Sequence, residues 1–291
     1  MIIIFPLKIR FIINPISGSG KQKGIEEYIT EHLENFEIIY TKKAGDATII
    51  SKEAANENID AVIAVGGDGT VNECLKSLVN TNTALGVIPC GSGNGFAYHI
   101  GMDRTTEKAV KQLKNIRIEV IDSCTANGVP FVNVSGIGFD AHIANLFSTL
   151  AERGFINYVK LVFRELSYKA KEYTIRYNNI ERKVNAYMIA FANASQYGND
   201  AKISPMADFQ DGLLDCVILK EFPKWKIPFF ILKVATGKAH LSKYVEIIQC
   251  QKMTIKAKDT LLHLDGEPFR ASNPIEVALL PKSLKILIPN G

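Results

Sequence analysis

The sequence predicts an α/β amino-terminal domain followed by a β-rich, antiparallel carboxy-terminal domain. Two observations lead to this fold class. Strand and helix patterns alternate up to residue 122, which indicates a largely parallel sheet. Beyond residue 122 extended segments crowd together, interrupted by only two helical patterns. We therefore expect domains at 1–122 and 123–291, with a hinge near Asp122–Cys124 and a ligand cleft between the domains.

The elements of the first domain follow from short apolar runs and from the periodic segments that separate them. The expected strands are 7–14, 36–41, 60–65, 84–89 and 117–122. The expected helices are 21–34, 46–57, 71–80, a short one after Ser92, and 105–114.

The second domain is expected to consist mainly of strands. These cover 130–135, 172–178, 182–193, 213–220, 252–258, 260–264, 275–280 and 284–288. Helical patterns lie near 140–168 and over 225–239.

Composition favours a folded, soluble protein of a reducing compartment. Apolar residues make up 47% and charged residues 22% of the chain, as in ordinary globular proteins. The net charge of +4 lacks the concentrated basic face of a nucleic-acid binder. The five cysteines form no CxxC pair, which argues against a disulfide framework or a zinc knuckle. We expect a cytoplasmic protein; contact with the inner face of the membrane and the oligomeric state stay open.

Three glycine-rich loops follow expected strands of the first domain: "NPISGSGK" at 14–21, "GGDGT" at 66–70 and "PCGSGNGFA" at 89–97. In open parallel sheets, ligands bind beyond the carboxyl ends of the strands. Glycine allows backbone N–H groups to approach a ligand, and helix amino termini attract phosphate. The three loops together predict a phosphate-binding edge of the sheet.

Asp68 decides which kind of phosphate site this is. A carboxylate in a phosphate-binding loop repels the ligand unless a cation lies between them. Mg²⁺ prefers oxygen ligands and commonly bridges a carboxylate to substrate phosphates. The loop at 66–70 therefore predicts a magnesium-bound polyphosphate.

The motif "GGDGTVNE" resembles the nucleotide-binding signature of the diacylglycerol kinase catalytic domain, shared by bacterial lipid kinases and sphingosine or long-chain-base kinases. "NPISGSGK", "YTKKAGDA" (40–47), "IPCGSGNGFA", "DGLLD" (211–215) and "LDGEPF" (264–269) extend the resemblance over nearly the whole chain. It implies a Rossmann-like first domain of the NAD kinase and phosphofructokinase type, ATP as phosphoryl donor and Mg²⁺. The implied nucleotide-binding residues are Asn14, Pro15, Ser17, Gly18, Lys21, Thr41, Gly66, Gly67, Asp68, Gly69, Thr70, Asn72, Glu73, Gly91, Ser92 and Asn94.

One position departs from the bacterial pattern. Gly95 follows Asn94, where bacterial diacylglycerol kinases usually have an aspartate. A small residue there is closer to the sphingosine-type branch. The identity of the lipid substrate therefore stays open.

Asp265 and Glu267 lie at an expected turn between extended segments. Phosphoryl transfer to a hydroxyl needs positioning, charge neutralisation and a carboxylate that accepts the hydroxyl proton. By resemblance, Asp265 occupies the position of the family's proposed base. Asp68 is the rival base, as in sphingosine-type kinases. Taken alone, an Asp-Gly pair is an ordinary hairpin signal.

The resemblance implies two further ligand-binding positions. In bacterial members the segment matching 206–215 binds a structural Mg²⁺, here through the Asp211 carboxylate and the carbonyls of Asp208 and Leu213; an ordinary turn is an equal contender. Asp140 resembles the acidic residue that sphingosine-type kinases direct at the polar head of the substrate. Its other reading is a partner for a helix dipole.

The segment 225–239 combines aromatic residues with lysines. Such a composition suits a contact with a membrane surface, although a core helix is the plainer reading.

The sequence thus favours an ATP- and Mg²⁺-dependent lipid kinase acting on diacylglycerol or a sphingoid base. An NAD kinase and a non-catalytic nucleotide-binding module are the alternatives.

Overall fold

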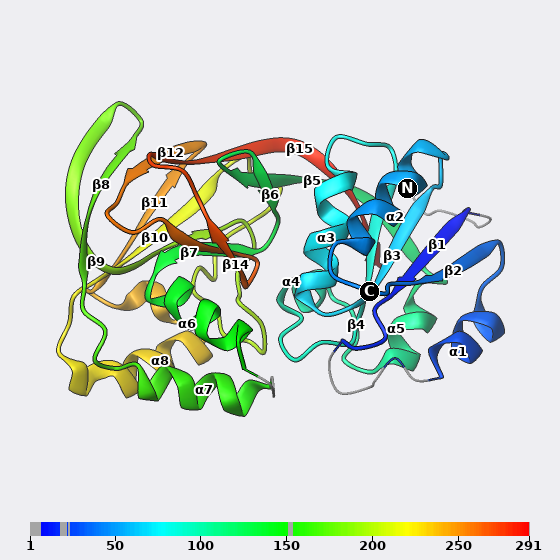
Figure 1. The fold of residues 1–291 in the computed structure, drawn as a ribbon, viewed down its shortest axis with the longest axis horizontal. Helices are drawn as coiled ribbons and strands as arrows, with labels where there is room; N and C mark the ends of the chain where they lie inside the picture. Colours follow the sequence, from blue (N-terminus) through cyan, green and yellow to red (C-terminus); the bar gives the residue numbers. More distant parts are fainter. Residues whose placement is uncertain (1–6, 18–21, 23, 151–153, 291) are drawn as a thin grey trace. The chain divides into compact units, whose positions relative to one another are not determined.

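The computed structural model describes residues 7–17, 22, 24–150 and 154–290, and they form two compact units (Figure 1). The first unit contains the chain up to Ile121 together with Lys282–Gly291, and the second contains Asp122–Pro281. The predicted combination of a parallel α/β domain with a β-rich domain is confirmed.

The first unit is built on a parallel sheet with the strand order β15-β4-β3-β1-β2. The four amino-terminal strands are β1 (Ile9–Ile13), β2 (Phe36–Tyr40), β3 (Ala61–Gly66) and β4 (Ala84–Pro89). The helices are α1 (Ile25–His32), α2 (Asp46–Asn56), α3 (Asp68–Leu78), α4 (Gly95–His99) and α5 (Thr106–Gln112). Every residue of β1, β3 and β4 is buried, as expected for a parallel sheet covered on both faces.

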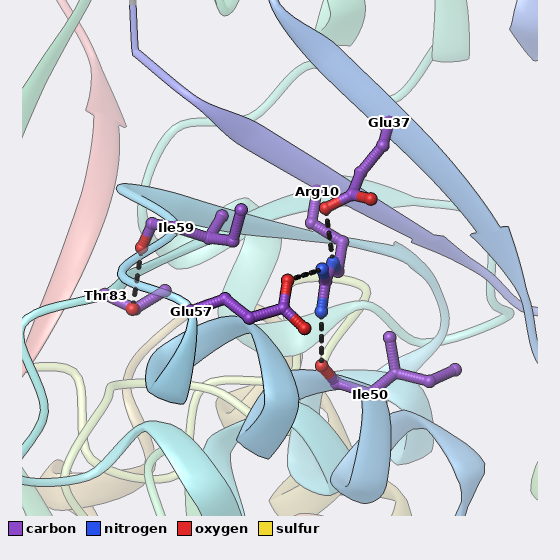
Figure 2. A network of polar contacts seen from close by, with 6 residues as sticks. All are labelled: Arg10, Glu37, Ile50, Glu57, Ile59 and Thr83. Atoms are coloured by element: carbon purple, nitrogen blue, oxygen red, sulfur yellow. Dashed lines mark hydrogen bonds and ion pairs between the residues drawn. The ribbon is translucent and has the colours of Figure 1, made fainter.

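The charged side chain of Arg10 lies within this buried layer. Arg10 on β1 is almost fully buried, and its guanidinium donates to Glu37 at 2.7 Å, to Glu57 at 2.6 Å and to the carbonyl of Ile50 at 3.3 Å (Figure 2). These partners come from β2, from the middle of α2 and from the residue that follows α2. The arginine therefore links a central strand to its neighbour and to a covering helix.

The second unit is mainly antiparallel. Its strands are β6 (Val129–Phe131), β7 (Val134–Gly138), β8 (Lys171–Tyr177), β9 (Ile180–Ala192), β10 (Leu214–Lys220), β11 (Val245–Cys250), β12 (Lys252–Lys256), β13 (Leu261–Leu264) and β14 (Glu267–Arg270). Its helices are α6 (Phe139–Ser148), α7 (Phe155–Arg164) and α8 (Ile227–Ala235), with short 3₁₀ turns η1 (Lys224–Lys226) and η2 (Ala239–Leu241). The long strand β9 pairs with β7 and β8 at different parts of its length, and with β10.

Two strands belong partly to each unit. β5 (Ile116–Ala126) runs without a break through the predicted hinge at 122–124, and β15 (Ile275–Pro289) is one strand where the sequence suggests two. The predicted helical region at 140–168 is two helices, α6 and α7. The predicted strand at 130–135 is two strands, β6 and β7, and the strands β11 and β14 are absent from the sequence-based expectation. β6 and β14 are the short return strands of hairpins, and they have too few residues for a clear alternating pattern.

Candidate active site

The three glycine-rich loops of the first unit meet at one edge of its sheet. The Asn14 side chain, after β1, donates to the Thr70 hydroxyl at 3.2 Å. The Asp68 carboxylate, after β3, accepts the backbone N–H of Asn94 at 2.8 Å, in the loop after β4. Because β1, β3 and β4 are parallel neighbours, their carboxyl ends lie together. The convergence expected from the sequence is present.

The glycines also have a packing role that the sequence does not reveal. A Cβ atom on Gly91 would lie 2.5 Å from the Gly67 Cα atom, and one on Gly66 would lie 2.4 Å from the Thr70 hydroxyl oxygen. A Cβ atom on Gly93 would lie 2.9 Å from the Asp68 carboxylate. Real Cβ atoms do not approach other atoms so closely. The small residues thus allow the loops to pack directly on one another.

Asn94 holds the third loop in shape. Its amide oxygen accepts the Gly91 N–H at 2.8 Å, and its amide nitrogen donates to the Gly91 carbonyl at 2.7 Å and to the Tyr98 hydroxyl at 3.0 Å. Its backbone is left-handed, with φ of 54°, which asparagine tolerates better than most residues. Asn94 therefore organises the loop through its own bonds.

Glu73 also binds protein groups. Its two carboxylate oxygens accept the backbone N–H groups of Gly45 at 2.9 Å and of Ala47 at 3.2 Å. These donors belong to the amino terminus of α2, where a negative charge is favourable. Glu73 thus caps α2 from the neighbouring helix α3. Thr41 directly follows β2 at the same sheet edge, and its backbone N–H donates to the Ile13 carbonyl.

The other predicted nucleotide-binding residues lie on or beside these loops. Asp68 begins α3, and Gly69, Thr70 and Asn72 follow in its first two turns, with Asn72 and Thr70 buried. Pro15 and Ser17 lie in the first loop, and Ser92 lies between Gly91 and Gly93. The Ser17 hydroxyl is buried and makes no hydrogen bond within the described residues. The predicted positions Gly18 and Lys21 lie outside the described residues.

In the second unit, Asp265 lies at the turn that the sequence predicts. Asp265 and Gly266 join β13 to β14, and both have positive φ, 51° and 92°. Two successive positive φ values define a type I′ hairpin turn. Glu267 is the first residue of β14, partly exposed beside the turn.

The Asp265 carboxylate is buried and anchored. It accepts the backbone N–H groups of Val132 at 3.1 Å and of Asn133 at 2.9 Å, and the Asp265 N–H donates to the buried Ser135 hydroxyl at 3.1 Å. Asp265 therefore fastens the β13-β14 hairpin to the strand region before β7. These bonds give it a structural role in addition to any chemical one.

Asp140 is part of a buried polar cluster that the sequence does not reveal. It lies in the first turn of α6, and its carboxylate accepts from the backbone N–H of Ala141, from the Tyr197 hydroxyl at 3.2 Å and from His263 Nε2 at 3.2 Å. The Gly266 N–H donates to His263 Nδ1 at 3.1 Å, which makes Nε2 the protonated nitrogen of a neutral ring. Burial, followed by the negative charge of Asp140, raises the pKa of Tyr197 well above its ordinary value.

His263 and Tyr197 carry no sequence signal for this role. They lie 123 and 57 positions from Asp140 in the chain, and only the antiparallel pairing of β13 with β7 brings His263 near α6. Through His263, the Asp140 carboxylate is connected to the turn that carries Asp265.

The loop before β10 contains the predicted structural metal ligands. Asp208 accepts the Gln210 N–H and Asp211 accepts the Leu213 N–H, each at 2.9 Å. Burial, and then the charges of Asp208, Asp215 and Asp122, raise the pKa of Asp211 above its ordinary value. Within the described residues, no group of three or more His, Cys, Asp or Glu side chains has a metal-binding arrangement. The predicted set uses only one carboxylate, so it stays a prediction.

Comparison with known proteins identifies the family. The model of the diacylglycerol kinase catalytic domain matches residues 8–126, and that of the YegS C-terminal NAD kinase beta sandwich-like domain matches residues 133–288. The chain is 28% identical to a diacylglycerol kinase of Bacillus subtilis, with 96% of each protein covered, and 26% identical to one of Mycobacterium tuberculosis, with 97% of this chain and 95% of the other covered.

A solved structure agrees in fold. A crystal structure of a diacylglycerol kinase from Bacillus anthracis superimposes with a TM-score of 0.73 over 97% of both chains, at 22% identity. The family resemblance seen in the sequence is thereby confirmed: the chain belongs to the family of lipid kinases that combine a diacylglycerol kinase catalytic domain with a YegS-type carboxy-terminal domain.

Proposed function

We propose that the protein transfers the γ-phosphoryl group of ATP, with Mg²⁺, to the hydroxyl group of a membrane lipid, either diacylglycerol or a sphingoid base. The observation that carries this proposal is the convergence of the loops after β1, β3 and β4, tied together by Asn14–Thr70 and Asp68–Asn94. This is the edge of a parallel sheet at which ligands bind.

The residues at this edge fit a nucleotide. The amino terminus of the eleven-residue helix α3 lies at the loop junction, and helix amino termini favour phosphate. The buried Ser17 hydroxyl offers a further polar group in the first loop. Glu73 and Asn94, in contrast, support the site by shaping it, because their side chains already bind backbone groups.

Asp68 is proposed as the residue that holds Mg²⁺ at the phosphates. An ionised carboxylate has about four lone-pair sites, so the bond from the Asn94 N–H is compatible with a cation. When bound there, the metal neutralises charge on the phosphates. The proposed structural metal is a separate ion, held by the Asp211 carboxylate and the carbonyls of Asp208 and Leu213. Burial raises the pKa of Asp211, and the negative charges of Asp208, Asp215 and Asp122 raise it further; a cation would offset those charges.

Asp265 is proposed to accept the proton of the lipid hydroxyl, with Glu267 beside it. The Val132 and Asn133 N–H groups hold its carboxylate in one orientation, and catalysis requires such a fixed acceptor. Asp140 is proposed to act on the polar head of the lipid together with Tyr197 and His263. Asp68 remains the alternative base.

The test is an acceptor screen with γ-labelled ATP and Mg²⁺. Parallel reactions contain mixed micelles with diacylglycerol, mixed micelles with a sphingoid base, or soluble NAD, and the products are separated by chromatography. We expect a labelled lipid in one micelle arm and none without Mg²⁺. Labelled NADP would identify an NAD kinase instead, and nucleotide binding without any labelled acceptor would identify a non-catalytic module.

A further inference from the structure

Helix α8 is apolar on two opposite sides. Its sequence, Ile227–Ala235, contains a single charged residue, Lys233. A helix that is apolar all round is normally buried, yet no residue of α8 is fully buried. The prediction of a core helix for 225–239 therefore does not hold for the side of α8 that faces solvent.

The inner side holds α8 on the second unit. Ile227, Phe230 and Val234 pack against a cluster of buried residues that includes Phe222 and Ala239. The Phe222 and Phe230 rings lie 5.6 Å apart. These inner contacts fix the orientation of α8 and therefore also which of its side chains face solvent.

The outer side presents large apolar groups to solvent. Trp225 is 68% exposed, Phe229 62% and Leu232 61%. Their spacing of four and three residues places them on one side of the helix and the turn before it. The Trp225 and Phe229 rings lie edge to face at 6.4 Å, and Leu241 of η2 adds a further exposed side chain. We call these four side chains the apolar surface of α8.

The segment that carries this surface is rich in lysine. Residues 222–244 contain Lys224, Lys226, Lys233, Lys238 and Lys243 and no aspartate or glutamate, so this segment alone carries a charge of +5 in a chain whose net charge is +4. Lys226 Nζ lies 5.0 Å above the Trp225 ring. Its hydrogen bond to the Tyr244 hydroxyl, with the charges of Lys226 and Lys243, lowers the pKa of Tyr244, which shows the positive potential here.

We infer that the apolar surface of α8 and its lysines form a docking site for an anionic lipid bilayer. Aromatic and aliphatic side chains enter the boundary between headgroups and acyl chains, and lysines around them bind anionic headgroups. This inference deepens the proposed function, because a membrane-resident acceptor requires the enzyme to reach the bilayer. Its own test measures binding alone.

The charge pattern favours a membrane over a second copy of the chain. A symmetric dimer through this surface would place the same patch of each copy against the other. Five lysines without one acidic residue would then face five lysines, and like charges across an interface are strongly unfavourable. An anionic bilayer supplies the opposite charge.

The experiment uses Trp225, the single tryptophan of the chain, as its probe. The full-length protein is mixed, without ATP, with vesicles of phosphatidylcholine alone or of phosphatidylcholine with 30% phosphatidylglycerol, a composition chosen for a strong anionic charge. We expect co-sedimentation with the anionic vesicles, a blue shift of the tryptophan emission and protection from iodide quenching. Raised salt should weaken the binding.

Variants assign the two components of the binding. Phe229→Ala with Leu232→Ala should lower partitioning by about tenfold, because it removes two large apolar groups while Trp225 remains as probe. Lys224→Gln with Lys238→Gln should lower it by about fivefold per lysine on anionic vesicles only.

Two pairs of substitutions elsewhere on the second unit serve as matched controls. Ile180→Ala with Met206→Ala removes exposed apolar groups outside this surface. Lys256→Gln with Lys258→Gln removes exposed lysines from β12 and the loop after it. Both control pairs should bind vesicles like the unchanged protein.

Three results would overturn the inference. They are absence of binding to anionic vesicles, binding without any change at Trp225, and a blue shift that follows protein concentration without vesicles and disappears with the Phe229 and Leu232 substitutions. The third result would identify a dimer. Vesicle binding in a protein that phosphorylates no lipid would leave this surface in place and reject the proposed function alone.

Discussion

Replacement of Asp265 by asparagine separates the structural from the chemical role of this residue. Asparagine has nearly the shape of aspartate and tolerates the positive φ of 51° at this position. Its amide retains one acceptor for the N–H groups of Val132 and Asn133 but turns an NH₂ group toward the other. The Asp265→Asn variant should therefore fold, with reduced stability.

The size of both effects follows from the bonds. The loss of one hydrogen bond to a charged acceptor, with a buried N–H left unpaired, costs about 2–3 kcal/mol, which corresponds to a decrease in Tm of about 5–10 °C for a unit of this size. If Asp265 accepts the hydroxyl proton, kcat falls by a further factor of about 10²–10⁴. Binding of ATP should persist, because the proposed nucleotide-binding residues lie in the first unit.

Ser135→Ala is the matched control. It removes the acceptor of the Asp265 N–H and leaves the carboxylate unchanged, so it should lower Tm by a similar amount and leave kcat within a few-fold. Both variants are assayed for lipid phosphorylation well below their measured Tm, with nucleotide affinity determined by calorimetry. Near-normal turnover in a folded Asp265→Asn protein would refute the assignment and favour Asp68 as the base.

Three further expectations follow from the described contacts. His263→Asn retains an acceptor for the Gly266 N–H and should keep most of the activity that His263→Phe loses, whereas equal loss in kcat would contradict a positioning role. Gly91→Ala, whose Cβ atom would clash with the neighbouring loop, should lower the free energy of unfolding by about 1–3 kcal/mol and abolish ATP binding. The control Gly101→Ala has open space but a positive φ; it should lower the free energy of unfolding by about 1 kcal/mol and bind ATP normally. Because the folded-state pKa of Asp211 is raised, the unfolded chain releases this proton first, and stability falls as pH rises from the ordinary value of 3.8 through the raised value. Asp211→Asn should therefore remove this decrease in a chelator-treated protein and also remove any gain in Tm on addition of Mg²⁺; a pH profile identical to that of the unchanged protein would contradict the described electrostatics.

The first unit is largely predictable from its sequence because its signals are local. Short apolar runs give β1, β3 and β4, and the glycine-rich loops after them follow in fixed order. The bonds between the loops are a consequence of parallel pairing, so their meeting at one edge could be anticipated. The packing of Gly67 against Gly91 could not, because it depends on the distance between two backbones.

The second unit is less predictable for the same physical reason. The cluster of Asp140, Tyr197 and His263 depends on strand pairing across more than a hundred residues, and no local pattern encodes it. The Asp265-Gly266 turn was predictable from turn chemistry, whereas its anchoring to Val132 and Asn133 was not. Similarly, the composition of 225–239 allowed either a core or a membrane contact, and it did not reveal that Phe230 and Val234 pack inward while Trp225 is exposed.

The path of β15 has a consequence for biosynthesis. Its last part pairs Ile286 with Leu85 of β4, and its neighbours Ser283 and Asn290 bond to Asn80 and Asn115. The parallel sheet of the first unit is thus completed by residues that are synthesised only after the whole of the second unit. A nascent or truncated chain that lacks β15 would leave one edge of β4 unpaired, and unpaired strand edges promote aggregation. Quality control during translation should therefore act most strongly on products that end before β15.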